Sequence, residues 1–136
     1  MNERHNINRL FSRLFLALLL LTGSTVCMAE VTEISQAELA QRIKIDSAGL
    51  ILDVRSAGEY AEGHIPGAVN IPHDQLGSRL NEIGEHRDKE VVLYCRSGKR
   101  AGVAAGILES AGFSRLRHLT GDMLDWQGNG NLPVSK

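Results

Sequence analysis

Cys95 stands in a short stretch of residues that is suited to nucleophilic chemistry. Three of the five residues that follow it, Arg96, Lys99 and Arg100, are positively charged. Positive charge close to a cysteine favours its thiolate, which is the form that attacks an electrophile. Gly98 allows the backbone to turn tightly, so that successive N–H groups can point at one anion. We therefore interpret this stretch as a thiolate nucleophile inside an anion-binding loop.

The alternative is that Cys95 packs as a small buried side chain, as free cysteines often do. The charged neighbours favour the nucleophile instead, because three cations crowd a single thiol at one point of the chain. A solvated turn of charged residues is a further alternative, but such a turn is not usually built around a single cysteine.

Two apolar runs, Leu50–Val54 and Glu90–Tyr94, are typical of strands buried inside a parallel sheet. Cys95 directly follows the second run, and a helix is predicted from about Arg100 to Ala111. In a parallel α/β sheet, the loops at the carboxyl ends of the strands form the binding site. The N-terminus of the following helix carries partial positive charge, which also favours an anion there.

The helix after Cys95 is expected to turn one apolar face to the sheet, with Gly102 and Gly106 allowing close approach. The expected members of that face are Val103, Ala104, Ile107, Leu108 and Ala111.

Short apolar runs alternate with helical patterns along the rest of the chain, which indicates an α/β fold. Ser35 and Ser56 each precede a glutamate by three residues, so both are expected to cap helices. Asp74 is expected to cap another helix, which would run to about Ile83. The remaining strands are expected at Val31–Ile34, Ala68–Ile71 and Arg115–Leu119, the last at an edge of the sheet.

Asp53 and Arg55 follow the first buried run, so they lie at the same end of the sheet as Cys95, where the carboxyl ends of the strands meet. Two interpretations remain open: the pair orients the cysteine loop, or it is a buried ion pair with a structural role. His64 is interpreted as a turn residue, because a thiolate that is already ionised needs no histidine base. We expect no metal site, because ligand spacing is absent among the other histidines of this part of the chain, His73, His86 and His118.

The first 29 residues have the order of parts found in a secretory signal. A polar segment with Arg4, Arg9 and Arg13 precedes the apolar run Leu14–Leu21, and small residues follow up to Ala29. The apolar run is shorter than the roughly 20 residues that span a bilayer.

We therefore expect residues 1–29 to be a cleaved signal peptide that directs the chain to the periplasm, and residues 30–136 to form one domain. No stable membrane association is expected after cleavage. Two alternatives remain open: an uncleaved membrane anchor, and a lipid-modified Cys27.

Composition excludes several other classes of protein. The net charge is −1 and aromatic residues make up only 4%, so neither a basic surface nor a stacking platform for nucleic acid is expected. Two cysteines are too few for a disulfide scaffold or a four-cysteine zinc site.

Two groups of motifs resemble the rhodanese-like domain family. The first comprises Asp53-Val54-Arg55, Glu59-Tyr60 and the run GHIPGAVNIP from Gly63 to Pro72. The second is the loop Tyr94–Arg100, which reads YCRSGKR. Trp126 and the closing NLPV of residues 131–134 are also similar to the family. The resemblance covers Val31 to Val134, and the layout is most similar to that of secreted single-domain rhodaneses of bacteria.

The resemblance implies a three-layer α/β fold with a mainly parallel five-stranded sheet. It also implies that Cys95 forms a persulfide and that the next five residues, Arg96, Ser97, Gly98, Lys99 and Arg100, bind the substrate anion. We thus expect a thiosulfate sulfurtransferase, which moves the sulfane sulfur of thiosulfate or a persulfide to cyanide or a thiol acceptor. These small molecules are the expected partners, and no cofactor is implied.

Two positions depart from the family's pattern. Ala101 stands where many members have serine, and Gly121-Asp122 stands where a Gly-Gly pair is common. Four residues separate Cys95 from Arg100, one fewer than in the loop of cysteine phosphatases, and the shorter loop favours a sulfur atom over a phosphate group. The rival function is a non-catalytic module that carries sulfur, senses oxidants or binds a partner through the same fold.

Overall fold

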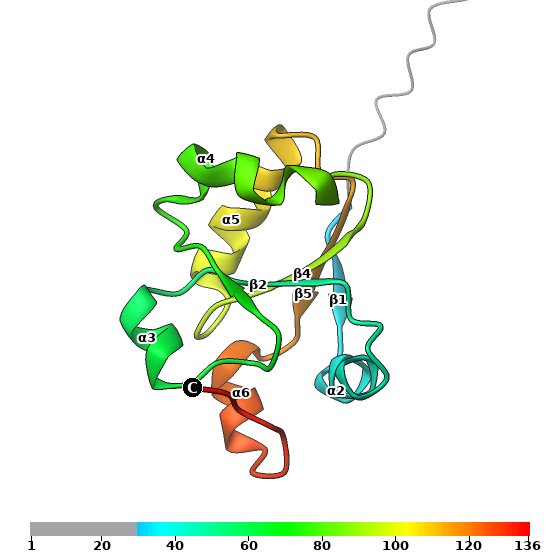
Figure 1. Ribbon diagram of the computed structural model, residues 1–136, viewed down its shortest axis with the longest axis vertical. Helices are drawn as coiled ribbons and strands as arrows, with labels where there is room; N and C mark the ends of the chain where they lie inside the picture. The colour runs from blue at the N-terminus through cyan, green and yellow to red at the C-terminus, as the bar shows by residue number, and fades with distance from the viewer. Residues whose placement is uncertain (1–29) are drawn as a thin grey trace, which may run out of the picture.

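The computed structural model describes residues 30–136 of the 136-residue chain. The predicted signal peptide and Cys27 lie outside the described residues. The described part contains one sheet of five strands in the order β1-β5-β4-β2-β3, and every neighbouring pair is parallel (Figure 1). The strands are β1 (Thr32–Ile34), β2 (Leu50–Asp53), β3 (Val69–Asn70), β4 (Glu90–Tyr94) and β5 (Arg115–Leu119).

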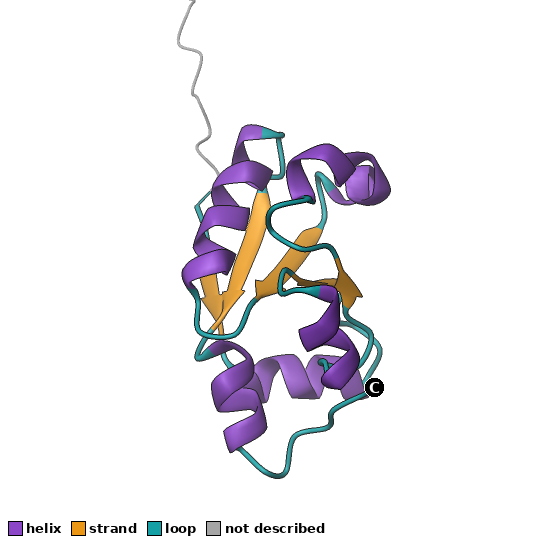
Figure 2. Cartoon of the chain, turned by 90° about the vertical axis from the view of Figure 1, so that its left-hand side faces the viewer, coloured by secondary structure: helices purple, strands orange, loops and turns teal. Residues whose placement is uncertain are grey.

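Helices cover both faces of this sheet (Figure 2). They are α2 (Gln36–Lys44), α3 (Ala57–Glu62), α4 (Leu76–Arg79), the 3-10 helix η1 (Leu80–His86), α5 (Lys99–Ser110) and α6 (Asp122–Gly128). The fold is therefore the expected three-layer α/β arrangement.

The two faces of the sheet bury alternate residues of the same strands, because successive side chains of a strand point to opposite faces. Leu52 and Leu93 pack in one cluster with Leu108 of α5. Ile51 and Val92 pack in the other cluster, which includes Trp126 of α6. Burial on both faces explains why β2 and β4 read as unbroken apolar runs.

Both predicted serine caps are present. Ser35 accepts a hydrogen bond from the Glu38 N–H at the start of α2. Ser56 and Glu59 form a complete capping box at the start of α3, in which each side chain bonds the other residue's backbone N–H. These caps satisfy N–H groups that have no partner inside the helix.

The prediction that Arg115–Leu119 lies at an edge of the sheet is wrong. The strand β5 lies between β1 and β4 and pairs with both. Polar side chains are accommodated on this interior strand because two of them have partners on the helices α2 and α6. Arg117 forms an ion pair with Glu38 at 2.7 Å, and His118 bonds to Asp122 at 3.0 Å.

Asp74 does not cap a helix. The chain turns at residues 72–75, where the Gln75 N–H bonds to the Pro72 carbonyl, and α4 begins only at Leu76. The predicted single helix is also divided, because α4 is followed by the 3-10 helix η1, which continues to His86.

The buried face of α5 is shifted from the predicted face, although Ala104 and Leu108 are buried as predicted and Ile107 and Ala111 pack partly buried against the core. Its buried residues are Ala101, Ala104, Ala105 and Leu108, whereas Val103 is 52% exposed. Gly102 and Gly106 do not face the sheet, because a Cβ atom at either position would meet nothing within 4 Å. The small alanines allow the helix to approach the sheet instead.

Within residues 30–136, no helix combines the length and the apolar character that crossing a membrane would require.

Two substitutions on α5 test this orientation. Leu108→Ala should lower the free energy of unfolding by about 2–5 kcal/mol, because it opens a cavity in the core. Val103→Ala should lower it by less than about 0.5 kcal/mol, because the side chain is exposed. Urea unfolding measures both changes, and equal losses would contradict the orientation of the helix.

Candidate active site

Cys95 is the first residue after β4, and its side chain is buried, with only 1% of the residue exposed. The backbone turns back on the thiol, and the Gly98 N–H donates a hydrogen bond to Sγ at 3.0 Å. Gly98 has a φ of +103° and stands at the N-terminus of α5. The loop is therefore curled around the sulfur atom at a helix start, as the sequence suggested.

The first turn of α6 holds the backbone of the cysteine from the other side. The Cys95 N–H donates to Asp122 Oδ1 at 2.8 Å, and the Cys95 carbonyl accepts from the Met123 N–H at 3.1 Å. The next carbonyl, that of Arg96, accepts from the Leu124 N–H at 3.1 Å. Both backbone polar groups of Cys95 are thus fixed by one neighbouring element.

Arg100 is paired with a carboxylate from outside the loop. Its guanidinium forms two hydrogen bonds to the Glu59 carboxylate, at 2.7 and 2.8 Å. The hydrogen bond to Arg100 lowers the pKa of Glu59 to about 2, against the opposing effect of burial. The remaining cations of the loop, Arg96 and Lys99, are exposed. Glu59 was recognised from the sequence as part of a helix cap and of the family motif, but not as a partner of Arg100.

Asp53 and Arg55 form a buried ion pair, with Nη2 and Oδ2 separated by 2.6 Å. Asp53 also accepts from the Tyr94 hydroxyl at 2.7 Å, and Arg55 donates to the Gly63 carbonyl at 2.8 Å. Burial on its own lowers the pKa of Arg55, but the hydrogen bonds and charge of Asp53 outweigh that effect and raise it. The pair joins the ends of β2 and β4 to the segment before β3.

This ion pair reaches the nucleophile through Tyr94, the residue before Cys95. The Tyr94 hydroxyl is held between Asp53 and the Ile65 N–H, which donates to it at 3.1 Å. Burial and the Asp53 charge raise the pKa of Tyr94, so the hydroxyl stays protonated as a donor. Within residues 30–136, no hydrogen bond or salt bridge joins Asp53 or Arg55 to residues 96–100.

His118, which is half-buried, pairs with the buried Asp122 beside the cysteine. His118 Nε2 lies 3.0 Å from Oδ2 and 3.1 Å from Oδ1 of Asp122, and Asp122 is only 2% exposed. From the sequence, Asp122 was a departure from a glycine pair and His118 was one of the histidines without metal-ligand spacing. Their spacing of four residues was the available signal, but the pairing depends on β5 lying directly beside β4.

The side chain of His64 makes a local contact, as expected for a turn residue, whereas its backbone makes a long-range one. Its Nδ1 lies 2.9 Å from the Tyr60 carbonyl, and its backbone pairs with Ser135 near the C-terminus. Within residues 30–136, no three side chains of His, Cys, Asp or Glu converge in a way that would hold a metal ion.

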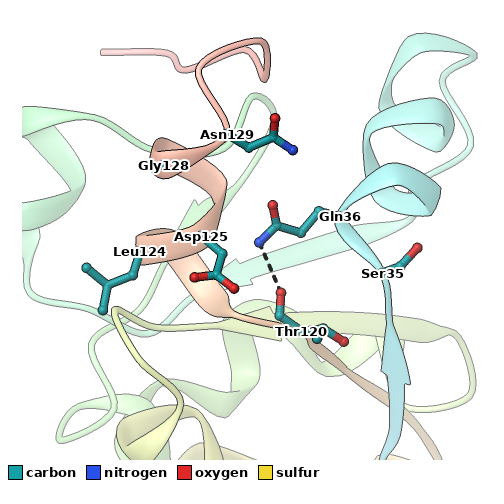
Figure 3. A pocket seen from close by; sticks show the side chains of 7 residues that line it. All are labelled: Ser35, Gln36, Thr120, Leu124, Asp125, Gly128 and Asn129. Atoms are coloured by element: carbon teal, nitrogen blue, oxygen red, sulfur yellow. Dashed lines mark hydrogen bonds between the residues drawn. The ribbon is translucent and has the colours of Figure 1, made fainter.

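Two hollows flank this region. A cleft of about 170 Å³ is lined by Arg100, Ser56, Pro72 and His73, among others. A wider groove of about 560 Å³ lies between the start of α2 and α6, where Gln36 donates to the Thr120 carbonyl (Figure 3). The cleft borders the cysteine loop at Arg100 and is also lined by Asp74, so it holds charges of both signs, whereas Asp125 gives the groove a negative charge.

A family model, the rhodanese-like domain, matches residues 35–129, which is more than half of the chain. The chain belongs to the rhodanese-like family. This finding confirms the resemblance, and the cysteine loop lies inside the matched region. A rhodanese-related protein from Thermoplasma volcanium has the same fold, with a TM-score of 0.65 and 29% identity, covering 76% of this chain and 97% of that one.

Several relatives carry names that refer to sulfur. A protein of Allochromatium vinosum named "Sulfurtransferase" is 36% identical over 104 residues, which are 76% of this chain and 94% of that protein. YrkF of Bacillus subtilis, provisionally named a sulfur carrier protein, is 36% identical over 100 residues. That match covers 74% of this rhodanese-like chain but only 53% of YrkF, so it spans about half of that relative.

Asp53→Asn should lower the free energy of unfolding by about 3–5 kcal/mol, because it leaves the Arg55 charge buried without a counter-charge. The matched control is Glu82→Gln, which breaks an exposed pair with Arg79 and should leave stability unchanged within measurement error. Urea unfolding at neutral pH measures both. A loss for Asp53→Asn no larger than that of the control would contradict a structural role for the buried pair.

Glu59→Gln tests the ion pair that holds Arg100. The pKa of Glu59 is lowered on folding, so its pairing stabilises the fold above the ordinary carboxyl range and is lost as the pH falls towards 2. The variant should be about 1 kcal/mol less stable than the wild type near pH 7. This difference should shrink between about pH 5 and 3 in urea unfolding. A difference that stays constant over this range would contradict the account.

Proposed function

We propose that the chain is a sulfurtransferase in which Cys95 takes up the sulfane sulfur of thiosulfate, or of a persulfide, and passes it to cyanide or a thiol. The observation that carries the proposal is the 3.0 Å hydrogen bond from the Gly98 N–H to Cys95 Sγ, at the start of α5. A backbone donor aimed at sulfur stabilises negative charge on it. Family membership and the sulfurtransferase-named relative also support the proposal.

The reaction follows a ping-pong cycle. The Cys95 thiolate attacks the outer sulfur of thiosulfate, a new S–S bond forms, and sulfite leaves with the electron pair of the broken bond. The product is a Cys95 persulfide anion. Cyanide or a thiolate then attacks the outer sulfur, which leaves as thiocyanate or a new persulfide. The Cys95 thiolate is regenerated, so no external oxidant or reductant is consumed.

The loop residues after Cys95 have complementary roles in this proposal. Arg96 and Lys99 are exposed and attract the anionic donor. Ser97 and Gly98 contribute the tight backbone turn, whose N–H groups hold the donor and then the persulfide. Arg100, held by Glu59, borders the cleft of about 170 Å³ and presents a fixed positive charge.

Cys95→Ser should reduce the release of sulfite from thiosulfate in the presence of cyanide by at least about a thousandfold. The matched control is Cys27→Ser, which changes the other cysteine of the chain and should retain activity. Both variants are assayed in the 136-residue chain. Activity at the wild-type level in Cys95→Ser would exclude the proposed nucleophile.

A second candidate is a sulfur carrier or sensor that needs a specific partner. The burial of Cys95, only 1% exposed, favours it, because a buried sulfur is less accessible to an acceptor. The carrier-named relative adds support. Turnover in the presence of cyanide separates the two candidates. A carrier takes up one sulfur atom and releases no further sulfite, whereas a sulfurtransferase releases sulfite repeatedly.

A further inference from the structure

The carboxylate of Asp122 occupies a position where it acts on two parts of the cysteine loop. Its Oδ1 accepts from the Cys95 N–H at 2.8 Å. Its Oδ2 lies beside Gly98, where a Cβ atom would approach to within 3.1 Å. Gly98 is the residue whose N–H donates to Sγ. One buried carboxylate therefore accepts a hydrogen bond from the residue that carries the thiol and lies beside the residue whose N–H donates to Sγ.

Asp122 adopts a backbone conformation that few side chains tolerate. Its φ is +52°, in the left-handed region where glycine is favoured and where Asp and Asn are the best tolerated of other residues. The preceding residue, Gly121, also has a positive φ of 77°. The chain places a carboxylate where a glycine would be less strained, so the side chain provides an interaction that offsets this cost.

A buried carboxylate beside a thiolate repels it, and His118 is placed to compensate that charge. His118 approaches both oxygens of Asp122, and its side chain is 28% exposed, so it exchanges protons with solvent. The hydrogen bond to Asp122 raises the pKa of His118 although burial opposes it, and Glu33 on the neighbouring strand β1 adds to the rise. The proton is therefore held by His118 at higher pH than in a free histidine.

We propose that Asp122 and His118 are positioning residues, which hold the Cys95 backbone through Asp122 and keep the negative charge of that carboxylate compensated through the His118 proton. For its role in sulfur transfer, this inference rests on the proposed function. When His118 loses its proton, the uncompensated carboxylate opposes an anion at Cys95. The loop also carries the positive groups Arg96, Lys99 and Arg100, which are present in every variant compared below.

The ratio of two alkylation rates tests the charge effect without requiring sulfur transfer. Iodoacetate is anionic and iodoacetamide is neutral, so the ratio of their rates at Cys95 reports local charge and is independent of the thiolate fraction. The measurement uses the 136-residue chain with Cys27→Ser, so that Cys95 is the sole thiol. Between about pH 5.5 and 8.5, the ratio should fall about three- to tenfold as His118 loses its proton.

Three variants test whether the proton of His118 causes this fall in the ratio. In His118→Asn the ratio should be low and independent of pH, because no proton compensates Asp122. Asp125→Asn changes an exposed acid of the same helix, and His73→Asn changes the histidine of the adjacent cleft; both should retain the wild-type inflection. A flat wild-type ratio, or an inflection that persists in His118→Asn, would overturn the proposal.

A second comparison tests the hold on the backbone. Asn and Gly both suit the φ of Asp122, but only Asn keeps an acceptor for the Cys95 N–H. Asp122→Asn should therefore retain kcat for sulfite release within about threefold, whereas Asp122→Gly should lose about tenfold. If Asp122→Asn and Asp122→Gly unfold at the same urea midpoint and have equal kcat values, the role of Asp122 in holding the backbone is overturned. If the wild-type chain releases no sulfite, the proposed function is contradicted. The alkylation ratio still tests the charge effect of Asp122 and His118 in that case.

Discussion

The position of Cys95 at the carboxyl end of a central parallel strand is the constraint on which the site depends. Because all five strands run in the same direction, the loops after β2, β4 and β5 meet at one end of the sheet, where the strands have their carboxyl ends. The residue before Cys95 is held by the Asp53–Arg55 pair through its hydroxyl. Cys95 itself is held by the first turn of α6. The nucleophile is therefore fixed in place by contacts on both sides.

Three pairs of opposite charges lie at this end of the sheet. Glu59 binds Arg100, Asp53 binds Arg55 and Asp122 binds His118, and each pair links a different neighbouring element to the strand end or the loop. Charges this close together in a partly buried site are tolerated because they are paired. The pairing also orients the groups before any substrate arrives, so little reorganisation is needed when negative charge develops on sulfur.

Local patterns in the sequence predicted much of this structure. The runs at β2 and β4, the serine caps of α2 and α3 and the loop at Cys95 follow from residue types over a few positions. The place of β5 inside the sheet could not be predicted, because Arg117 pairs with Glu38, which is 79 residues away, and the pairing of His118 with Asp122 becomes evident only once β5 lies beside β4. The roles of Glu59 and Asp122 were missed for the same reason: Glu59 is 41 residues from Arg100, and Asp122 is 27 residues from Cys95.

The central claim is that Cys95 carries sulfur as a persulfide inside its loop. The most direct test is the intact mass of the 136-residue chain with Cys27→Ser, recorded after thiosulfate alone and again after cyanide. The account predicts a gain of one sulfur atom that maps to Cys95, is removed by cyanide and is absent when Cys95 is also replaced by serine. No gain in mass after thiosulfate, or the same gain without Cys95, would contradict it.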